Sequence, residues 1–279
     1  MTVKWLEFSR YVSSKYSPNY VNIIIHYATK YFEFLENVQN IDVLPNTIKA
    51  NVIKSLIILS KYLGIYNDFK SRLQQYGIKS PRQDAIKSFL RILNSSNSDI
   101  LDWFVNAYNV VRDNERLYLR LLLTTGLRKD EGIKCFNKII ELSRENRLIE
   151  YYCTLPNSDV KALCHFKYPR EFLRRTKNVF ISFIDENLLN QIANSEPLTY
   201  PMLRKRLERH SLKLRLNELR DYYGTYLLNN GIPQQYIDML QGRIPVNIFL
   251  RHYLLVFNFK DLRDRVLSAI SQLEQKLSP

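Results

Sequence analysis

The sequence predicts a mostly α-helical protein with one small antiparallel β-sheet, an α+β fold. Three observations predict this class. Apolar residues recur at three- to four-residue intervals along most of the 279 residues. One stretch, residues 146–184, is instead rich in β-branched and aromatic residues around a turn. Hydrophobic residues make up 46% of the chain, which is enough for a sizeable core.

The first 78 residues are predicted to form a helical bundle. Residues 19–38 and 46–64 each place apolar side chains on one helical face. These side chains are Val21, Ile24, Ala28, Tyr31 and Leu35 in the first segment, and Ile48, Val52, Leu56, Leu59 and Leu63 in the second. Gly64 is suited to end the second helix, because glycine adopts the left-handed conformation that often follows one.

A linker is predicted at residues 74–84, where Gly77, Ser80 and Pro81 interrupt the helical pattern. We therefore expect an N-terminal helical domain over residues 1–78 and a second domain over residues 79–279.

The second domain is predicted to contain a β-hairpin between two groups of helices. Two β-rich runs flank the turn residues 156–159, and residues 178–184 suit a third strand. Helices are predicted at residues 83–94, 98–111 and 114–125 before the hairpin, and at 185–194, 199–209, 216–230, 233–241, 247–257 and 260–277 after it.

Charge and composition favour a polyanionic partner. The formal net charge is +14, which suits nucleic acid or an anionic membrane surface. No apolar run reaches the roughly 18 residues that span a bilayer, and the first residues lack a signal-peptide pattern. We therefore expect a cytoplasmic protein. The seven glycines form no phosphate-binding loop and the three cysteines no CxxC pair, so we expect neither a nucleotide cofactor nor a metal.

Two of the cysteines, Cys153 and Cys164, lie on the two arms of the predicted hairpin. With a turn near Asn157 they come close to opposite one another. We expect two buried thiols as the ordinary case, and a cross-strand disulfide mainly if the source is a hyperthermophile.

Two motifs carry the functional argument. In "TTGLRKDEG", residues 124–132, a helical pattern breaks at Gly126 and Arg128 follows. In "NELRDYYGTYLLNNGIPQQYIDMLQGRIPVNIFLRHYL", residues 217–254, Arg220 begins a helical segment, Gly242-Arg243 ends the next, and Tyr253 lies in a third.

Together these motifs resemble the catalytic domain of the tyrosine recombinases, the phage-integrase family. The "TGLR..E" element of the family matches at Thr125–Arg128 and Glu131, and its second arginine matches Arg220. The "LGH" element appears as "LQGR", Leu240 to Arg243, and the nucleophile position is Tyr253. The resemblance covers residues 82–257 and implies a tyrosine-recombinase catalytic domain preceded by a helical core-binding domain.

Two positions depart from the family pattern. Asn217 stands where the family has the histidine of "HxLR", and Arg243 stands where it has the histidine of "LGH". These substitutions are similar to those of archaeal virus and plasmid integrases of the fusellovirus type. They leave open which side chain would act as the general base.

The chemistry of phosphodiester cleavage suits these residue types. Attack on phosphorus builds negative charge on the non-bridging oxygens, and arginine offers them paired donors. Arg128 and Arg220 are the candidates for that clamp, with Arg243 as a third cation. Clustered arginines would also lower the pKa of a tyrosine hydroxyl from about 10.

The resemblance implies that Tyr253 displaces the 5′-oxygen and forms a 3′-phosphotyrosyl bond, for which no cofactor is needed. The leaving oxygen requires a proton, and Lys161 beside the hairpin turn is the candidate donor, with Lys167 as the alternative.

Each candidate also has an ordinary structural interpretation. Arg128 could be a surface residue, Tyr253 a core residue and Lys161 a solvated one. Asn217 could cap its own helix, and His252 could bind the phosphate or pack.

The implied partner is double-stranded DNA, enclosed in a C-shaped clamp of both domains and bound by a homotetramer, with affinity that falls as salt rises. The basic run of residues 203–215 could contact the DNA backbone or be solvated. The last helix could dock on its own core or on a neighbour. A type IB topoisomerase and a non-catalytic DNA-binding protein on an integrase scaffold are the rival functions.

Overall fold

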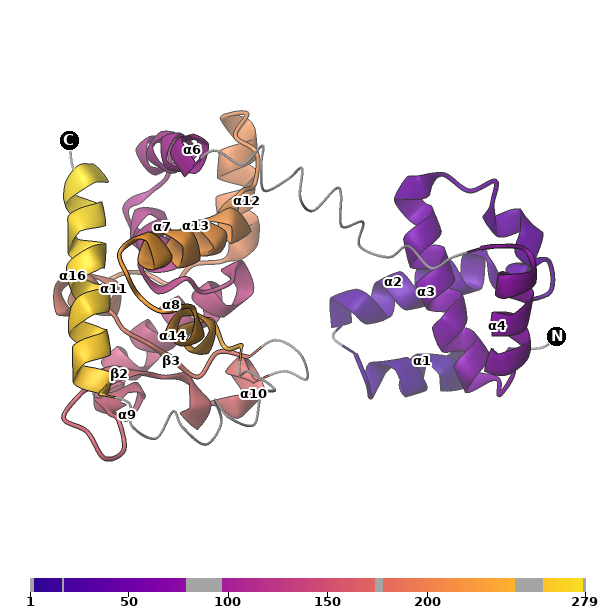
Figure 1. Cartoon of the computed structure of the whole chain (residues 1–279), viewed down its shortest axis with the longest axis horizontal. Helices are drawn as coiled ribbons and strands as arrows, with labels where there is room; N and C mark the ends of the chain where they lie inside the picture. The colour runs from indigo at the N-terminus through magenta and orange to yellow at the C-terminus, as the bar shows by residue number, and fades with distance from the viewer. Residues whose placement is uncertain (1–2, 17, 79–96, 174–177, 244–257, 278–279) are drawn as a thin grey trace. The chain divides into compact units, whose positions relative to one another are not determined.

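The computed structural model describes residues 3–16, 18–78, 97–173, 178–243 and 258–277 (Figure 1). The chain divides into two compact units, Met1–Asn94 and Ser95–Pro279, here called the N-terminal and C-terminal units. The predicted boundary at residues 78 and 79 adjoins a segment outside the described residues, so it stays a prediction. The predicted fold class is confirmed: the chain is mostly α-helical with a three-stranded antiparallel sheet.

The N-terminal unit is a helical bundle with its own hydrophobic core. It contains α1 (Trp5–Ser13), α2 (Pro18–Lys30), α3 (Asn46–Tyr62) and α4 (Tyr66–Gln75). Helix α3 packs against α2 and α4 and buries Val52, Leu56 and Leu59 completely. Gly64 follows α3 with φ +75°, as the sequence predicted.

The helix predicted over residues 19–38 is shorter in the structure. Helix α2 ends at Lys30, and 3₁₀ helices follow at Phe32–Leu35 and Val38–Ile41. Leu35, Val38 and Ile41 are all buried. Val38 and Ile41 are three residues apart in one 3₁₀ helix, which has three residues per turn, so both face the core.

The other helices of the described residues belong to the C-terminal unit. They are α6 (Asn97–Val110), α7 (Asp113–Thr125), α8 (Lys129–Arg144), α9 (Leu148–Tyr151), α10 (Pro169–Phe172), α11 (Glu186–Ala193), α12 (Tyr200–Arg209), α13 (Leu216–Asn229), α14 (Gln234–Leu240) and α16 (Phe259–Leu277), with a 3₁₀ turn at His165–Lys167. The predicted helices in this unit begin and end within one or two residues of these bounds, apart from 83–94 and 247–257, which lie outside the described residues. Helices α7 and α13 pack together through the middle of the unit (Figure 1).

The predicted hairpin and third strand are confirmed. Strands β1 (Tyr152–Thr154), β2 (Lys161–Cys164) and β3 (Ile181–Ser182) form a sheet in the order β1-β2-β3, with both pairs antiparallel. The turn contains Asn157 with φ +57°, a conformation that asparagine tolerates better than most residues.

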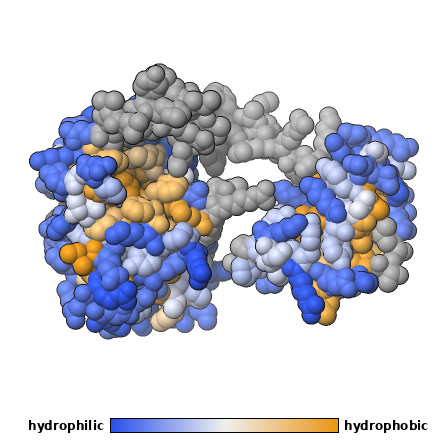
Figure 2. Space-filling view, turned by 90° about the horizontal axis from the view of Figure 1, so that it is seen from below, coloured by the Kyte–Doolittle hydropathy of each residue, from blue (hydrophilic) through white to orange (hydrophobic). Residues whose placement is uncertain are grey.

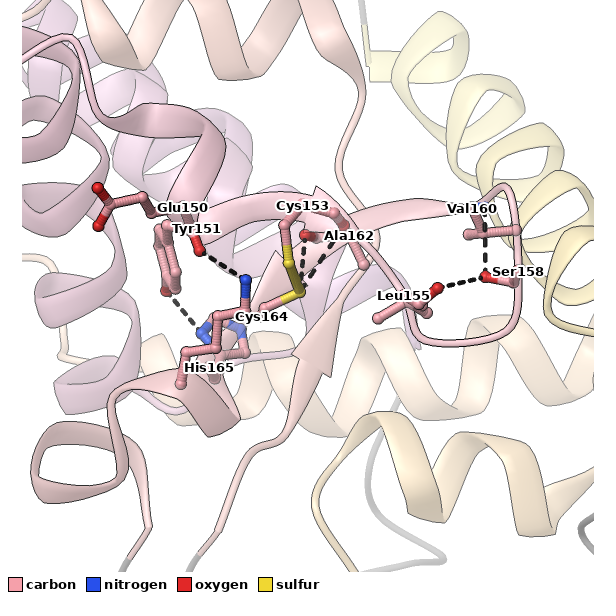
Figure 3. Close-up of a disulfide and its surroundings, with 10 residues drawn as sticks. Glu150, Tyr151, Cys153, Leu155, Ser158, Val160, Ala162, Cys164 and His165 are labelled. Carbon is pink, nitrogen blue, oxygen red and sulfur yellow. Dashed lines mark hydrogen bonds between the residues drawn. A yellow bond between two sulfur atoms is a disulfide. The ribbon is translucent and has the colours of Figure 1, made fainter.

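A disulfide joins Cys153 of β1 to Cys164 of β2 (Figure 3). The ladder pairs Cys153 with Ala162, so the two cysteines are diagonal rather than opposite neighbours. Residues 162 and 164 face the same side of the sheet, because side chains alternate along a strand, and the Cα atoms of the two cysteines are 6.4 Å apart. Of the two states left open by the sequence, the structure has the disulfide; Cys135 is a free, buried thiol.

A buried polar chain lies beside this sheet. The Tyr151 hydroxyl is 2.6 Å from His165 Nδ1, and His165 Nε2 is 2.9 Å from the Ser182 hydroxyl (Figure 3 labels Tyr151 and His165). All three residues are buried. Burial lowers the pKa of His165 to about 3, so the imidazole is neutral in the folded protein. These two hydrogen bonds therefore join α9, the 3₁₀ turn and β3 without a charged group.

The last helix, α16, docks on the core of its own unit. Leu262, Val266, Ile270 and Leu273 are buried. Arg120 Nε of α7 donates a 3.0 Å hydrogen bond to the Glu274 carboxylate, and the Tyr226 hydroxyl of α13 donates to the Ala269 carbonyl. Of the two dockings that the sequence allowed, the structure has the one within the chain.

The surface agrees with the composition. On the face seen in Figure 2, hydrophilic residues dominate both units, and apolar surface gathers mainly on the C-terminal unit. None of the helices in the described ranges is both long and apolar enough for a membrane span.

Candidate active site

Arg128 lies at a sharp break between two helices of the C-terminal unit. Helix α7 ends at Thr125, Gly126 adopts φ +63°, and Arg128 is the residue that precedes the first turn of α8. A Cβ atom at Gly126 would lie 2.3 Å from Cδ1 of the Tyr223 ring. Only glycine therefore fits this turn without displacing Tyr223 of α13. The local sequence thus determines where α8 begins and where Arg128 lies.

Glu131 holds Arg128 in place. Its carboxylate is buried and accepts a 3.0 Å hydrogen bond from the Arg128 backbone N–H and a 2.6 Å bond from Arg128 Nη1. Arg128 Nη1 also lies 3.5 Å from the carbonyl oxygen of Asn178. The Arg128 side chain remains 24% exposed, so part of the guanidinium can be reached by a ligand.

Arg220 is buried between two helix ends. It projects from the first turns of α13 and is only 4% exposed. Its Nη1 donates to the Gly126 carbonyl at 2.7 Å and its Nη2 to the Gln241 carbonyl at 2.5 Å. Gly126 and Gln241 are the residues that follow α7 and α14, whose carboxyl ends carry partial negative charge. Both ends therefore stabilise the cation.

The three arginines act on one another electrostatically. The pKa of Arg220 is lowered to about 10, first because the group is buried and then because Arg128 and Arg243 are positive, while Glu131 partly offsets the effect. Arg220 is hydrogen-bonded to Gly126 and to Gln241, and each of these lies two residues before another arginine, Arg128 or Arg243, so the three residues belong to one region of the unit.

Arg243 follows a second tight turn, at Gly242. A Cβ atom there would lie 1.7 Å from the Asn178 carbonyl oxygen, so the two backbones are in close contact. Arg243 Nη1 lies 3.2 Å from a carboxylate oxygen of Asp238, and the arginine side chain is 54% exposed. The same Asn178 carbonyl therefore lies beside both Arg128 and the turn that carries Arg243.

Asn217 caps a helix other than its own. Its Oδ1 accepts a 3.3 Å hydrogen bond from the backbone N–H of Lys129, the first residue of α8. This bond joins the start of α13 to the residue after Arg128. The side chain therefore lies next to the arginine cluster, and the contact that the structure gives it is with backbone.

The two candidate lysines lie on the sheet side of the unit. Lys161 Nζ is 5.9 Å from the centre of the Tyr152 ring, and Lys167 Nζ donates to the Glu150 carbonyl at 3.2 Å. The contacts found for these lysines are with Tyr152 and Glu150, and neither of these two residues is among the partners that hold the three arginines. Tyr253 and His252 lie outside the described residues.

Four groups contribute to this site in ways that the sequence motifs did not predict. Glu131 matched a motif, but the motif did not show that it binds Arg128, and the Asn178 carbonyl is a backbone group. Gln241 and Gly242 stand inside "LQGR", but their contacts with Arg220 and Asn178 join segments far apart in the chain. A spacing argument along one helix could not have found them.

The cluster suits an anion that carries several oxygens. Three arginines lie in one region, and arginine binds phosphate through paired donors. Arg220 is buried and so already desolvated, and Arg128 is held by Glu131 before a ligand arrives. This arrangement is the kind that stabilises negative charge developing during a reaction.

We expect the change Glu131→Ala to lower the free energy of unfolding of the C-terminal unit by about 2 kcal/mol. The change removes the acceptor of the Arg128 N–H and leaves the guanidinium without its carboxylate. Urea unfolding followed by Trp103 fluorescence in a Trp5→Phe background would measure it, since the chain has only two tryptophans.

Glu141→Ala is the matched control, because Glu141 is an exposed glutamate of the same helix that pairs with Lys138. Its loss should cost less than about 0.5 kcal/mol. Equal destabilisation by the two changes would contradict the role given to Glu131.

The chain is similar to a known protein family. A family model described as archaeal phage integrase matches residues 93–263 of the chain. A search of curated proteins finds no significant match. The matched range contains the three arginines, Asn217, both candidate lysines and Tyr253.

Proposed function

Because the chain belongs to the archaeal phage integrase family, we propose that it is a tyrosine site-specific recombinase. It would cut and rejoin DNA strands through a 3′-phosphotyrosyl intermediate and so integrate or excise a viral or plasmid element. Family membership supports a recombinase of the integrase type and DNA as its partner. The tyrosine mechanism is the proposal.

The observation that carries the proposal is that Arg220 is hydrogen-bonded to the Gly126 carbonyl, two residues before Arg128 in the same turn. Arg128 is held by Glu131 and Arg220 by two backbone carbonyls, so both guanidinium groups are fixed before substrate binds. A phosphodiester has two non-bridging oxygens whose charge rises during attack at phosphorus. Fixed donors stabilise that charge more than they stabilise the ground state, which is the condition for catalysis.

In the proposed reaction, the Tyr253 hydroxyl oxygen attacks phosphorus and the bond from phosphorus to the 5′-oxygen breaks. The hydroxyl proton leaves the tyrosine, and the 5′-oxygen takes up a proton, for which Lys161 is the first candidate and Lys167 the second. Attack by a 5′-hydroxyl of another strand on the phosphotyrosine then restores a phosphodiester. The ester conserves the bond, so no nucleotide is consumed.

The proposed assembly is a homotetramer on two DNA duplexes, acting in the cytoplasm of the host cell. The N-terminal unit would add DNA contacts through lysines exposed on its helices, among them Lys54 and Lys61 on α3. Phosphate contacts of this kind position the duplex without reading its sequence.

The test is a suicide DNA substrate, in which the short fragment that carries the released 5′-hydroxyl diffuses away, so the cleaved strand cannot be resealed. Wild-type protein should form a covalent protein–DNA adduct that survives denaturation, and mass spectrometry of the digested adduct should place the nucleotide on Tyr253. The Tyr253→Phe protein is the control and should form none. An adduct on another residue, or one that persists in Tyr253→Phe, would remove Tyr253 from the mechanism.

Two outcomes distinguish the rival functions. Absence of any adduct, with DNA binding intact, would favour a non-catalytic DNA-binding protein. Adduct formation together with relaxation of supercoils, but without strand exchange between two duplexes, would favour a topoisomerase of type IB. Exchange of flanking markers between two labelled duplexes supports the recombinase.

A further inference from the structure

Gln241 is buried beside Arg220 and is joined to it by two hydrogen bonds. The side-chain Nε2 of Gln241 donates to the Arg220 carbonyl at 2.9 Å, and Arg220 Nη2 donates to the Gln241 carbonyl. Gln241 is only 2% exposed. The two residues are 21 positions apart, so the two bonds join α13 to the end of α14.

A glycine in α13 supports a specific role for this amide. Gly224 lies one turn after Arg220 in the middle of α13, where glycine costs about 1 kcal/mol relative to alanine. A Cβ atom at this position would be 3.0 Å from Gln241 Nε2. The missing methyl group gives the amide room to reach the Arg220 carbonyl, which explains why the helix carries a glycine here.

The Gln241 amide also holds the end of α14 in place against Arg220 of α13. Arg220 reaches the Gln241 backbone carbonyl only while the end of α14 stays in register with α13. The side-chain bond in the opposite direction helps to hold that register, because it adds a second hydrogen bond between the same two residues. A residue that only filled the space would leave one hydrogen bond between them instead of two.

We propose that Gln241 is a positioning residue for the strand-cleavage reaction, which orients the Arg220 guanidinium toward the DNA phosphate. The inference rests on the proposed recombinase function and goes beyond it, because Gln241 itself touches no substrate. Its effect is transmitted through the reciprocal hydrogen bonds and through the close approach of Gly224.

The experiment replaces the amide without changing the size of the side chain much. Gln241→Leu should reduce the rate of covalent-adduct formation on saturating suicide substrate by about tenfold, which corresponds to about 1.4 kcal/mol. The affinity for DNA should stay within twofold of wild type. Gln235→Leu, in the same helix α14, is the matched control and should keep the wild-type rate.

A second readout does not depend on cleavage. In ¹⁵N-labelled protein, NMR relaxation and solvent exchange of the Arg220 Nε–H group report how firmly the guanidinium is held. Gln241→Leu should increase its mobility and exchange rate, whereas Gln235→Leu should not. This measurement needs no active enzyme.

A second variant covers the case in which Gln241→Leu does not fold. Gly224→Ala keeps the glutamine but places a methyl group against its amide, while alanine is the better helix former. We expect a slower cleavage rate and a looser Arg220 Nε–H group in a protein that folds as well as wild type. That combination separates positioning from general stability.

The outcomes are distinct. Cleavage within twofold of wild type in both variants would overturn the proposal, and so would slower cleavage with an unchanged Arg220 Nε–H signal. A looser Arg220 in protein whose wild type forms no adduct would refute the recombinase function but support the contact between Gln241 and Arg220.

Discussion

Replacing Arg220 with lysine is expected to reduce the rate of DNA strand cleavage about a thousandfold, as loss of a charge-stabilising donor does elsewhere. Arg220 donates to two carbonyls, those of Gly126 and Gln241, and a guanidinium has five N–H groups in all. A lysine ammonium has three donors at one point on a flexible stem and cannot bridge both helix ends while facing a phosphate. The positive charge is retained, so the change tests geometry rather than charge.

Single-turnover formation of the protein–DNA adduct, with protein in excess over suicide substrate, measures this effect. Arg147→Lys is the control, because Arg147 is an exposed arginine that pairs with Glu145 and Glu150 on the surface. It should cleave at the wild-type rate. A thermal midpoint close to wild type would exclude misfolding of Arg220→Lys, and cleavage within threefold of wild type would contradict the role of Arg220.

The second large effect concerns stability and its dependence on pH. His165 is buried and neutral, and burial lowers its pKa from 6.5 to about 3. In the unfolded chain the imidazole takes up a proton below its ordinary pKa, whereas in the folded protein it does so only near pH 3. The unfolded state therefore binds more protons between these values, and stability falls as the pH falls.

The lowered pKa of His165 determines the pH range over which the stability changes. The contribution of His165 is fully present above pH 6.5 and is lost progressively toward pH 3, at about 1.4 kcal/mol per pH unit and about 5 kcal/mol in total. Unfolding free energies of wild type and His165→Gln, measured by Trp103 fluorescence, should converge as the pH is lowered from 6.5 to 4.5. Carboxylates titrate in both proteins, so the difference between them isolates the histidine.

His210→Gln provides the control, since His210 is exposed at the end of α12. Its stability should follow the wild-type curve over the same range. If His165→Gln also followed that curve in parallel, the imidazole would have to be charged in the folded protein, and the buried chain from Tyr151 to Ser182 would need another description.

Helical periodicity predicted much of this architecture from the sequence. The faces at Val52, Leu56 and Leu59, and at Leu262, Val266 and Ile270, are buried as the spacing required. The helix boundary at Gly126 was predictable because glycine and a change of pattern coincide there. The family resemblance assigned Arg128 and Arg220 to one site, although these two residues are 92 positions apart in the sequence.

Other features depend on contacts that no local pattern encodes. The end of α2 at Lys30 was missed because residues three apart and four apart both fit an α-helical face until the 3₁₀ turns begin. The diagonal disulfide depends on strand register, which a sequence fixes only through side-chain packing. Gln241 and the Asn178 carbonyl act on arginines from distant segments, and neither residue type signals such a role.

The two tight turns of the site differ in how much sequence change they allow. At Gly126 the obstacle is a side chain, the Tyr223 ring, so a smaller residue at position 223 would open room and the two positions should drift together among relatives. At Gly242 the obstacle is the peptide group of Asn178, which every amino acid carries. No substitution elsewhere in the chain can relieve that crowding, so we expect position 242 to require glycine more strictly than position 126.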